Sequence, residues 1–417
     1  MKINTKQKII VIGGGFAGVQ LIKNLDEQLF DILLIDKINH HQFQPLFYQV
    51  AASQLEPASI SFPLRNIFKY KKNLQIRLAE LLSVNAFENK IDTSIGSFNY
   101  DVLVIAVGCT TNFFGNEVIK QNSFTLKTTN DAIAIRNHIL QTFEDIISAE
   151  ENDKEALLNL TIVGAGPTGV ELAGAFAEIK KNILPKDYPG INFTQFNINL
   201  IEGSKDTLNS MSDLAKSTSR KYLEEMGVHI MSETFVKNYD GNTIELSNGN
   251  SLKSKTVIWA AGVIGNAVNG LDSNAKKQGN RIAVNRTNLV EGCLTIYAIG
   301  DIALMETPKY PKGHPQLANV AINQAKNLAK NLKRQANNTT QKEFEYTDLG
   351  SMATIGRNKA VVDLPFYHFK GYFAWLVWMF LHLMLILSVR NKLIIFINWV
   401  WAYFTKDTSL RLILKQK

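Results

Sequence analysis

The stretch KIIVIGGGFAG, residues 8–18, decides the fold of the N-terminal part of the chain. Its first five residues, Lys8–Ile12, end in four apolar residues and predict a buried parallel strand, and a helical pattern follows the glycines. Gly13, Gly15 and Gly18 occupy the three glycine positions of G-x-G-x-x-G. The first allows a tight turn, the second lets the backbone approach a pyrophosphate, and the third lets the helix pack closely against its strand. The stretch therefore predicts a strand, a phosphate-binding loop and a helix.

An acidic residue completes this pattern. The next predicted strand, Phe30–Ile35, ends at Asp36, eighteen residues past Gly18. A carboxylate at this place accepts hydrogen bonds from both hydroxyls of a ribose. The order of strand, glycine loop, helix, strand and acid favours a dinucleotide site over an ordinary tight turn.

The same pattern occurs a second time. The predicted strand Leu158–Val163 leads into the loop Gly164–Gly169, and the strand Phe196–Ile201 ends at Glu202. An acid at this position favours NADH over NADPH, because a carboxylate repels a 2′-phosphate. The loop residues expected at the pyrophosphate are Gly164, Gly166, Pro167, Thr168 and Gly169.

Three further predicted strands end in glycine: Tyr100–Val107 at Gly108, Thr256–Ala261 at Gly262, and Thr295–Ile299 at Gly300. The first two are placed where the chain would cross between domains. Ligands bind at the carboxyl ends of such strands, so Asp301 can reach the ribityl chain of the first nucleotide. We expect an α/β fold with two Rossmann-like dinucleotide-binding domains, one inserted in the other.

Composition narrows the class of protein. A chain of 417 residues can build two or three domains, and 46% apolar with 20% charged residues is typical of globular proteins. The two cysteines, Cys109 and Cys293, form no CxxC, and no metal-ligand cluster is visible, so we expect no metal. The polar start, Met1–Lys8, predicts no signal peptide and domains that face the cytoplasm.

The C-terminal segment differs from the rest of the chain. Four of the five tryptophans lie in the last 45 residues, and residues 366–417 carry +6 of the net charge of +8. Its basic residues are Lys370, Arg390, Lys392, Lys406, Arg411, Lys415 and Lys417. A basic, aromatic segment fits an anionic lipid surface better than a nucleic acid.

This segment could span a bilayer or lie on it. Tyr372–Val389 has no formal charge over eighteen residues, roughly 27 Å of helix and just short of a bilayer core. Leu393–Phe404 is too short to return, so a span would place basic residues on the far side, against the positive-inside tendency. We therefore favour two helices in the membrane interface, and a dimer interface is the other explanation. His382 is expected to be a packed residue.

Three stretches make the chain resemble type II NADH:quinone oxidoreductases, which are two-dinucleotide-domain flavoproteins: Phe43–Ala51, Gly164–Gly174 and Leu349–Asp363. The resemblance implies FAD on residues 1–115 and 270–345, NAD on 116–269, and a membrane-association region at 346–417. It further implies a single-subunit enzyme that pumps no protons, lies peripherally on the cytoplasmic face of the cell membrane and forms a homodimer.

The candidate cofactor residues follow from the patterns and the resemblance together. Those expected at FAD are Gly13, Gly15, Phe16, Ala17, Gly18, Asp36, Lys37, Gln44, Gln49, Ala106, Gly108, Gly300, Asp301, Gln316, Leu317 and Ala318. Those expected at NADH, besides the loop residues above, are Glu171, Glu202, Ala261 and Gly262. A helix predicted after His314-Pro315 would stabilise negative charge on the reduced flavin.

The resemblance also implies the residues of catalysis. Glu171 would lie between nicotinamide and flavin, although the helix dipole alone also explains an acid there. The family motif A-Q-x-A-x-Q reads Ala318–Asn323 here, with Asn319 and Asn323 at the glutamine positions. Asparagine is shorter by roughly 1.5 Å, about one carbon–carbon bond, so the flanking glutamines could substitute. Lys359 matches a lysine near the quinone entrance, or is a surface lysine.

We expect hydride transfer from NADH to FAD and then two-electron reduction of a membrane quinone. Two other functions stay open. A sulfide:quinone reductase needs a pair of redox cysteines, which Cys109 and Cys293 do not convincingly supply. An NADH-sensing flavoprotein or membrane adaptor would bind NADH without turnover.

Overall fold

The computed structural model describes residues 6–408 and 410–414, and its chain forms two compact units. The first unit comprises the residues up to Gln42, Phe62–Thr110 and Val263–Thr347. The second unit comprises Phe43–Ser61, Thr111–Gly262 and the residues from Asp348 on. Residues 1–5 of the polar start, on which the prediction of no signal peptide depends, lie outside the described residues. The basic tail residues Lys415 and Lys417 lie outside them as well.

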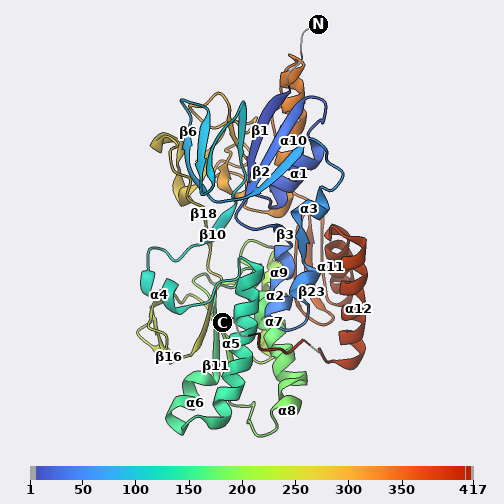
Figure 1. Cartoon of the computed structure of the whole chain (residues 1–417). Coiled ribbons are helices and arrows are strands. Elements are labelled where there is room, and N and C mark those ends of the chain that lie inside the picture. Colours follow the sequence, from blue (N-terminus) through green and yellow to red (C-terminus); the bar gives the residue numbers. More distant parts are fainter. Residues whose placement is uncertain (1–5, 409, 415–417) are drawn as a thin grey trace. The chain divides into compact units, whose positions relative to one another are not determined.

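A parallel five-stranded sheet forms the centre of the first unit (Figure 1). Its order is β20-β9-β1-β2-β5, and neighbouring strands pair in parallel. The bounds are Gln7–Ile12 for β1, Phe30–Asp36 for β2, Leu74–Leu78 for β5, Val102–Ile105 for β9 and Ile296–Ala298 for β20. The predicted parallel strands of this α/β fold are therefore confirmed.

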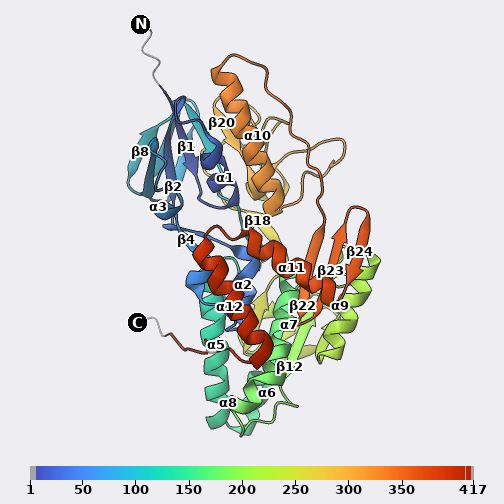
Figure 2. The same cartoon turned by 90° about the vertical axis from the view of Figure 1, so that its right-hand side faces the viewer.

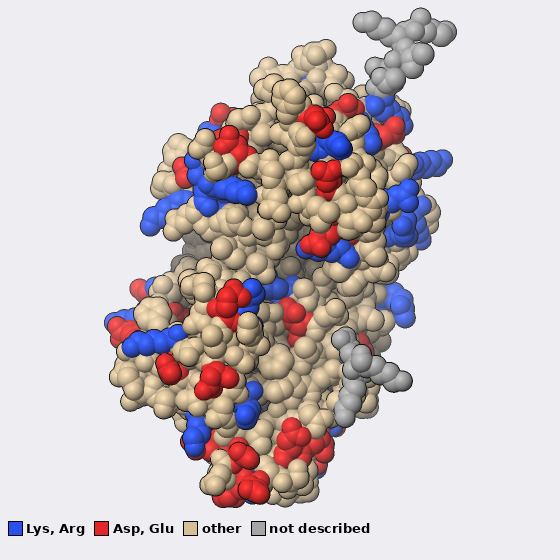
Figure 3. Space-filling view, turned by 60° about the vertical axis from the view of Figure 1, so that its left-hand side comes forward, with Lys and Arg blue, Asp and Glu red and all other residues tan. Residues whose placement is uncertain are grey.

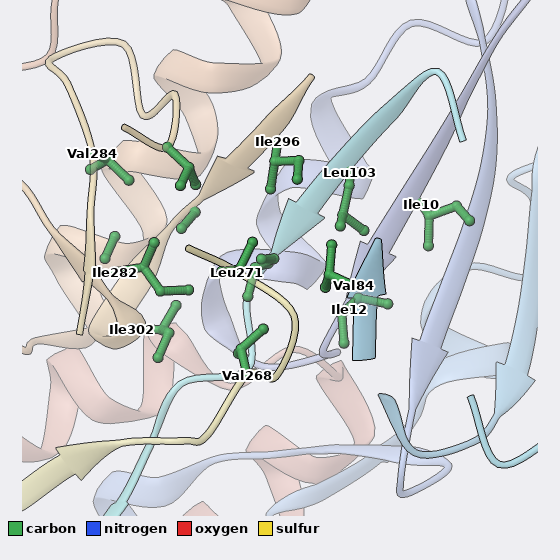
Figure 4. Packing of buried hydrophobic residues seen from close by; sticks show 14 of the residues in the cluster. Ile10, Ile12, Val84, Leu103, Val268, Leu271, Ile282, Val284, Ile296 and Ile302 are labelled. Atoms are coloured by element: carbon green, nitrogen blue, oxygen red, sulfur yellow. The ribbon is translucent and has the colours of Figure 1, made fainter. Parts of the chain in front are cut away.

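Both faces of the middle of this sheet are buried, which is why Ile9–Ile12 of β1 and the whole of β9 are apolar. Ile9 and Val11 of β1 pack with the helices α1 (Phe16–Asn24) and α10 (Ala318–Ala336). Their neighbours in β1 face the other way, into a second core beside β6 and the 268–305 region (Figure 4). Each such side chain, when fully buried, contributes about 1.5–3 kcal/mol. Helices pack on one face of the sheet and extended segments on the other. This packing holds the carboxyl ends of the strands in fixed positions.

The second unit has its own parallel sheet, of four strands in the order β13-β12-β11-β17. The bounds are Asn159–Val163 for β11, Asn197–Ile201 for β12, Val228–Met231 for β13 and Thr256–Trp259 for β17. α7 (Pro167–Asn182) follows β11, as the second glycine pattern predicts. The long helix α5 (Thr129–Ser148) starts at a capping box made by Thr128 and Asp131.

The C-terminal part of the second unit is a three-stranded antiparallel sheet followed by two helices (Figure 2). The strands are β22 (Ser351–Gly356), β23 (Lys359–Leu364) and β24 (Tyr367–Lys370), and the helices are α11 (Tyr372–Leu385) and α12 (Val389–Thr405). The sheet was not anticipated from the sequence, whereas the two helices were. Within residues 6–408 and 410–414, no helix combines the length and the apolar character that crossing a bilayer requires.

Shorter elements complete the two units. The strands are β3 (His40–Gln42), β4 (Ser61–Pro63), β6 (Leu81–Asn85), β7 (Lys90–Thr93), β8 (Gly96–Asn99), β10 (Cys109–Thr111), β14 (Val236–Tyr239), β15 (Thr243–Leu246), β16 (Ser251–Lys253), β18 (Val263–Gly265), β19 (Ile282–Ala283) and β21 (Ala303–Leu304). The helices are α2 (Phe47–Ala51), α3 (Leu64–Ile67), α4 (Glu117–Asn122), α6 (Glu151–Leu157), α8 (Leu184–Asp187) and α9 (Asp213–Glu225). On the face drawn in Figure 3, basic and acidic side chains are interspersed.

The compact units do not follow the expected domain boundaries everywhere. Residues 43–61, expected in the FAD domain, cluster with the second unit because α2 packs on α5 and α7. The described residues from Asp348 on, expected to belong to a separate region at 346–417, cluster there too because β22 packs on α7. The assignment of one cofactor to each domain stays a prediction.

Candidate functional site

The two glycine loops have the same local geometry. Gly13 and Gly164 adopt φ of +104° and +103°, a turn that favours glycine. A methyl group on Gly18 would overlap the carbonyl oxygen of Gly13, and the matching glycine of the second loop has the same contact. Gly15 and Gly166, by contrast, have open space where a side chain would begin. This open space is what close approach of a phosphate to the backbone needs.

Asp36 faces the first glycine loop. Its carboxylate accepts hydrogen bonds from the backbone amides of Gly14 and Ile38, the latter over 2.8 Å. Burial raises the pKa of this carboxyl, and the two amides act in the opposite direction. The next residue, Lys37, is exposed and forms an ion pair of 2.5 Å with Glu80. Asp36 thus lies beside the first glycine loop, where its role as a ribose acceptor stays a prediction, whereas Lys37 lies on the surface.

Glu202 repeats this arrangement in the second unit. Its carboxylate accepts from the amide of Ala165 over 2.6 Å and from the amide of Ser204 over 2.7 Å. Ala261 and Gly262, also expected at NADH, directly follow β17. Because β17 is the neighbour of β11, these residues and the second loop lie at the same carboxyl edge of the sheet.

Side-chain amides hold the turn after β20 in the first unit. The amide of Gly300 donates to Gln324 Oε1 over 2.8 Å, and Gln316 Nε2 donates to the carbonyl of Asp301 over 3.1 Å. The Asp301 carboxylate accepts from Cys109 Sγ over 3.0 Å. Both glutamines that flank the asparagine pair are therefore engaged in shaping this turn.

The other FAD candidates of the first unit lie at the starts of α1 and α10 and at the end of β9. They are Phe16, Ala17, Ala106, Gly108, Leu317 and Ala318. Gln44 and Gln49 differ, because they belong to the second unit. Gln44 is exposed and Gln49 is buried. The sequence-predicted FAD residues are thus divided between the two units.

A pocket lies within the second unit, between α2, α7, the β22–β23 turn, α11 and α12. Its lining residues include Tyr48, Gln49, Glu171, Glu178, Arg357, Trp378, Trp399 and Tyr403. Apart from two carboxylates and one guanidinium, these side chains are aromatic or amide groups. Such a lining suits a flat apolar molecule with a few polar atoms.

The two carboxyls of α7 are perturbed by this environment. Burial raises the pKa of Glu171 well above its usual range, and the backbone amide of Thr354 and the indole of Trp378 lower it in part. The Trp378 Nε1 atom is buried and forms no hydrogen bond with a described residue, so the indole faces the carboxyl outside bonding geometry. Burial also raises the pKa of Glu178, against the amide and charge of Arg357. Burial therefore favours the protonated form of Glu171 in the pocket.

The remaining candidates for catalysis do not line this pocket. Asn319 and Asn323 lie one turn apart on α10 in the first unit, and Asn323 Nδ2 donates to Asn319 Oδ1 over 3.0 Å. Lys359 Nζ lies 3.0 Å from a Glu225 carboxylate oxygen and 4.9 Å from the centre of the Tyr222 ring. Its surroundings thus also fit a surface lysine.

The sequence alone did not single out most of the pocket. Tyr48 belongs to the quoted stretch Phe43–Ala51, but only Gln44 and Gln49 were chosen from it. Glu178 follows Glu171 by two helical turns, a spacing that places both on one face of α7 and could have identified the pair. Arg357, between β22 and β23, has no such local signal.

Sequence families match most of the chain. Residues 7–325 match the pyridine nucleotide-disulphide oxidoreductase family. Residues 349–406 match the NDH2 C-terminal domain, and this range contains the unanticipated sheet and both aromatic helices.

Curated relatives and solved structures point the same way. The type II NADH:quinone oxidoreductase Ndh of Mycobacterium tuberculosis is 30% identical over 420 residues, which cover 96% of this chain and 89% of that protein. The type II NADH:quinone oxidoreductase of Staphylococcus aureus is 27% identical, covering 85% and 89%. The fold matches NDH2 of Plasmodium falciparum with a TM-score of 0.91 at 22% identity, covering 99% of this chain and 100% of that one. Sulfide:quinone oxidoreductase of Aquifex aeolicus matches with 0.73 at 20% identity, covering 96% of each.

Proposed function

The chain belongs to the type II NADH:quinone oxidoreductases, and on this premise we propose which unit holds which cofactor and where the quinone binds. The enzyme oxidises NADH and reduces a quinone by way of a flavin, without pumping protons. When bound, the flavin accepts a hydride and passes two electrons on. The protein residues contribute binding, orientation and proton positioning.

The flavin is FAD, and the first unit holds it. The open space at Gly15 fits a pyrophosphate, and Asp36 fits the adenosine ribose. Asp301, held between Cys109 and Gln316, is placed for the ribityl hydroxyls. The first turn of α10 contributes free amides for the flavin ring.

NADH binds to the second unit. Its pyrophosphate lies on the loop Gly164–Gly169, where Gly166 leaves room for it. Its ribose hydroxyls replace the amides of Ala165 and Ser204 as partners of the Glu202 carboxylate. Because this carboxylate would repel a 2′-phosphate, NADH is the preferred substrate over NADPH.

The quinone binds in the pocket beside Glu171. The observation that carries this assignment is a buried carboxyl, Glu171, inside an aromatic pocket whose outer wall is α11 and α12. A reduced quinone needs two protons, and Glu171 can deliver one to its oxygen. Lys359 is retained as a candidate for the path by which quinone enters, and Asn319 and Asn323 stay predicted quinone-side residues.

The outer faces of α11 and α12 bind the cytoplasmic surface of the membrane. Their exposed apolar residues are Tyr372, Phe373, Leu376, Phe380, Leu381, Met384, Leu385, Val389, Leu393, Phe396, Ile397, Val400, Trp401 and Phe404. Apolar rings with basic neighbours such as Arg390 and Lys392 suit headgroup depth. A homodimer that shares part of this surface is compatible with it. Sedimentation with phosphatidylglycerol vesicles should fall sharply in the double variant Phe380→Ser, Phe396→Ser.

One spectroscopic experiment tests the assignment of cofactor and acceptor. The purified protein should be yellow, release FAD on denaturation, lose its flavin colour on addition of NADH, and regain it with short-chain ubiquinone or menaquinone. A colourless protein would contradict the flavin assignment. Bleaching by NADH without recovery by quinone would favour the NADH-sensing function, and bleaching by sulfide would favour the sulfide reductase.

A further inference from the structure

Three side chains of the second unit form a chain of hydrogen bonds from α12 to the pocket. Trp399 Nε1 donates to Gln49 Oε1 over 2.8 Å. Gln49 Nε2 in turn donates to Tyr48 Oη over 2.8 Å. Tyr48 and Gln49 are neighbours on α2, are 5% and 6% exposed, and line the pocket together with Glu171. The chain therefore connects a helix that has an exposed apolar face to the inner wall of the pocket.

The indole of Trp399 fixes the direction of every bond in this chain. An indole N–H can only donate, so the Gln49 atom that faces it must be the amide oxygen. The amide nitrogen of Gln49 therefore faces Tyr48, and because it too can only donate, the Tyr48 hydroxyl must accept. The hydroxyl proton of Tyr48 consequently points away from Gln49. Among residues 6–408 and 410–414, none accepts it by a hydrogen bond.

The position of Trp399 is itself fixed, because α12 is held near both ends. Asn391 Nδ2 donates to the carbonyls of Ala58 and Ser59 over 3.0 and 2.9 Å. At the other end, the Arg357 guanidinium donates to two carbonyl oxygens in the last turn of α12, over 2.7 and 3.1 Å. Trp399 lies between these two attachments, so its indole can serve as a fixed donor.

We propose that Tyr48 donates a hydrogen bond to an oxygen of the quinone in this pocket, and that Gln49 and Trp399 are positioning residues that aim its proton. This inference rests on the proposed function. Burial, and then the nearby Glu171, raise the pKa of Tyr48 well above its usual range, so the hydroxyl keeps its proton at neutral pH. Trp399 belongs to a helix whose outer face is the proposed lipid-binding surface. Contact with the membrane and the orientation of the Tyr48 hydroxyl proton therefore depend on the same helix, α12.

The direct test is Tyr48→Phe in the full-length holoenzyme. We expect the quinone kcat/KM to fall roughly 3- to 10-fold, the value of one neutral hydrogen bond, mainly through a higher quinone KM. The rate with ferricyanide, a polar acceptor that does not need the pocket, should stay unchanged. Tyr70→Phe is the matched control, because the Tyr70 side chain is 81% exposed.

A sharper test reverses the direction of the hydrogen bond between residue 49 and Tyr48 without changing Tyr48. In Gln49→Glu, measured at a pH high enough to ionise this buried carboxyl, the carboxylate accepts from both sides, so the Tyr48 hydroxyl turns to donate to it and the proton leaves the pocket. The quinone kcat/KM should then fall as far as in Tyr48→Phe. In Trp399→Phe the Gln49 amide becomes free to rotate, and we expect a smaller loss of roughly 2- to 5-fold. A role of these residues in packing alone would not give this order.

Quinone kinetics equal to those of the unmodified enzyme in both Tyr48→Phe and Gln49→Glu would overturn the inference. If Tyr48→Phe loses its flavin, Gln49→Glu and Trp399→Phe decide in its place. Failure of the proposed function gives a different result, because the unmodified chain would then reduce ferricyanide but no quinone at all.

Discussion

Two helices of this chain begin at the same kind of glycine loop and then differ. α1 spans nine residues, whereas α7 spans sixteen. Two positions after the last glycine of the loop, α1 has Gln20 and α7 has Glu171. Five positions after it, α1 has the exposed Lys23, whereas α7 has Gly174, which is covered by the carbonyl of Ile355 in β22.

The difference shows that one local motif serves two purposes. In the first unit the helix completes a nucleotide loop and packs beside α10. In the second unit the helix continues past the loop, carries two carboxyls into the pocket and supports the C-terminal sheet. Binding a dinucleotide therefore needs only the loop and first turn, and the added length of α7 provides the chemistry.

The largest expected effect comes from Gly174→Val. A side chain there would overlap the backbone of Ile355, so α7 and β22 would have to separate. Overpacking of this kind costs about 1–3 kcal/mol or more, and we expect little folded protein or a much lower Tm. Lys23→Val, the same change at the matching position of α1, should fold normally. A thermal melt of Gly174→Val that matches Lys23→Val would disprove the contact.

The roles of the two glycine loops can be distinguished with the variants Gly15→Val and Gly166→Val. No protein atom lies within 4 Å of a Cβ built at either position, so both variants should fold, but each blocks one phosphate position. We expect Gly15→Val to lose flavin, read from the visible spectrum. Gly166→Val should keep its flavin and raise the NADH KM roughly 10- to 100-fold, a steric cost of about 1–3 kcal/mol. The opposite pattern would mean that the two units hold the cofactors the other way round.

A smaller change is expected at the acid of the second loop. In Glu202→Arg the repulsion of a 2′-phosphate is replaced by attraction, so the ratio of kcat/KM for NADPH over NADH should rise roughly tenfold or more. Asp36→Arg should lower flavin content and leave this ratio unchanged. An unaltered ratio in Glu202→Arg would remove Glu202 from the NADH ribose.

Much of this architecture could be predicted from sequence, because the glycine loops and acids are local signals. The strand Lys8–Ile12 was identified because both of its faces are buried from Ile9 to Ile12, which makes these four positions apolar. Predicted strands were too long by one or two residues at several ends, as for β9 and β20, because apolar sequence continues beyond the paired segment. The two C-terminal helices were likewise visible as uncharged aromatic runs.

The pocket could not be predicted in the same way. The hydrogen bond between Gln49 and Trp399 joins residues 350 positions apart, and no pattern in either stretch indicates the partner. The sheet of β22, β23 and β24 was missed because its turn residues, such as Asn358 with φ of +62°, are recognised only in context. Glu171 was identified only through the family resemblance, since the helix dipole explains it equally well.

Titration of the two carboxyls of α7, Glu171 and Glu178, should give a measurable effect on the stability of the protein. Because burial raises the pKa of Glu171 and Glu178, the folded protein binds their protons more tightly than the unfolded chain. Their contribution to stability is full below the unfolded pKa and is lost as pH rises through the folded pKa. Tm should therefore fall as pH rises above about 4.5. The double variant Glu171→Gln, Glu178→Gln should flatten this fall by on the order of 2 °C, whereas Glu27→Gln, at the exposed position just beyond α1, should not.

The smallest effect is expected at Lys359. Its ion pair with Glu225 is partly exposed, so Lys359→Ala should cost less than about 1 kcal/mol of unfolding free energy. Lys221→Ala, which removes a second lysine near the same carboxylate, is the control. If Lys359→Ala raises the quinone KM and Lys221→Ala does not, Lys359 belongs to the quinone path. Lys359 would then act beside Glu178 of α7, whose pKa its charge lowers.

The contact between Gly174 and Ile355 can form only late in synthesis of the chain. Ile355 follows Gly174 by 181 residues (355 − 174). A ribosome adds roughly 5–20 residues per second, so the strand that covers α7 emerges about 10–40 s after the helix itself. During that interval the nascent chain carries an uncovered helix face, the kind of surface that chaperones bind. Biogenesis of the second unit thus waits for the last part of the chain to be translated.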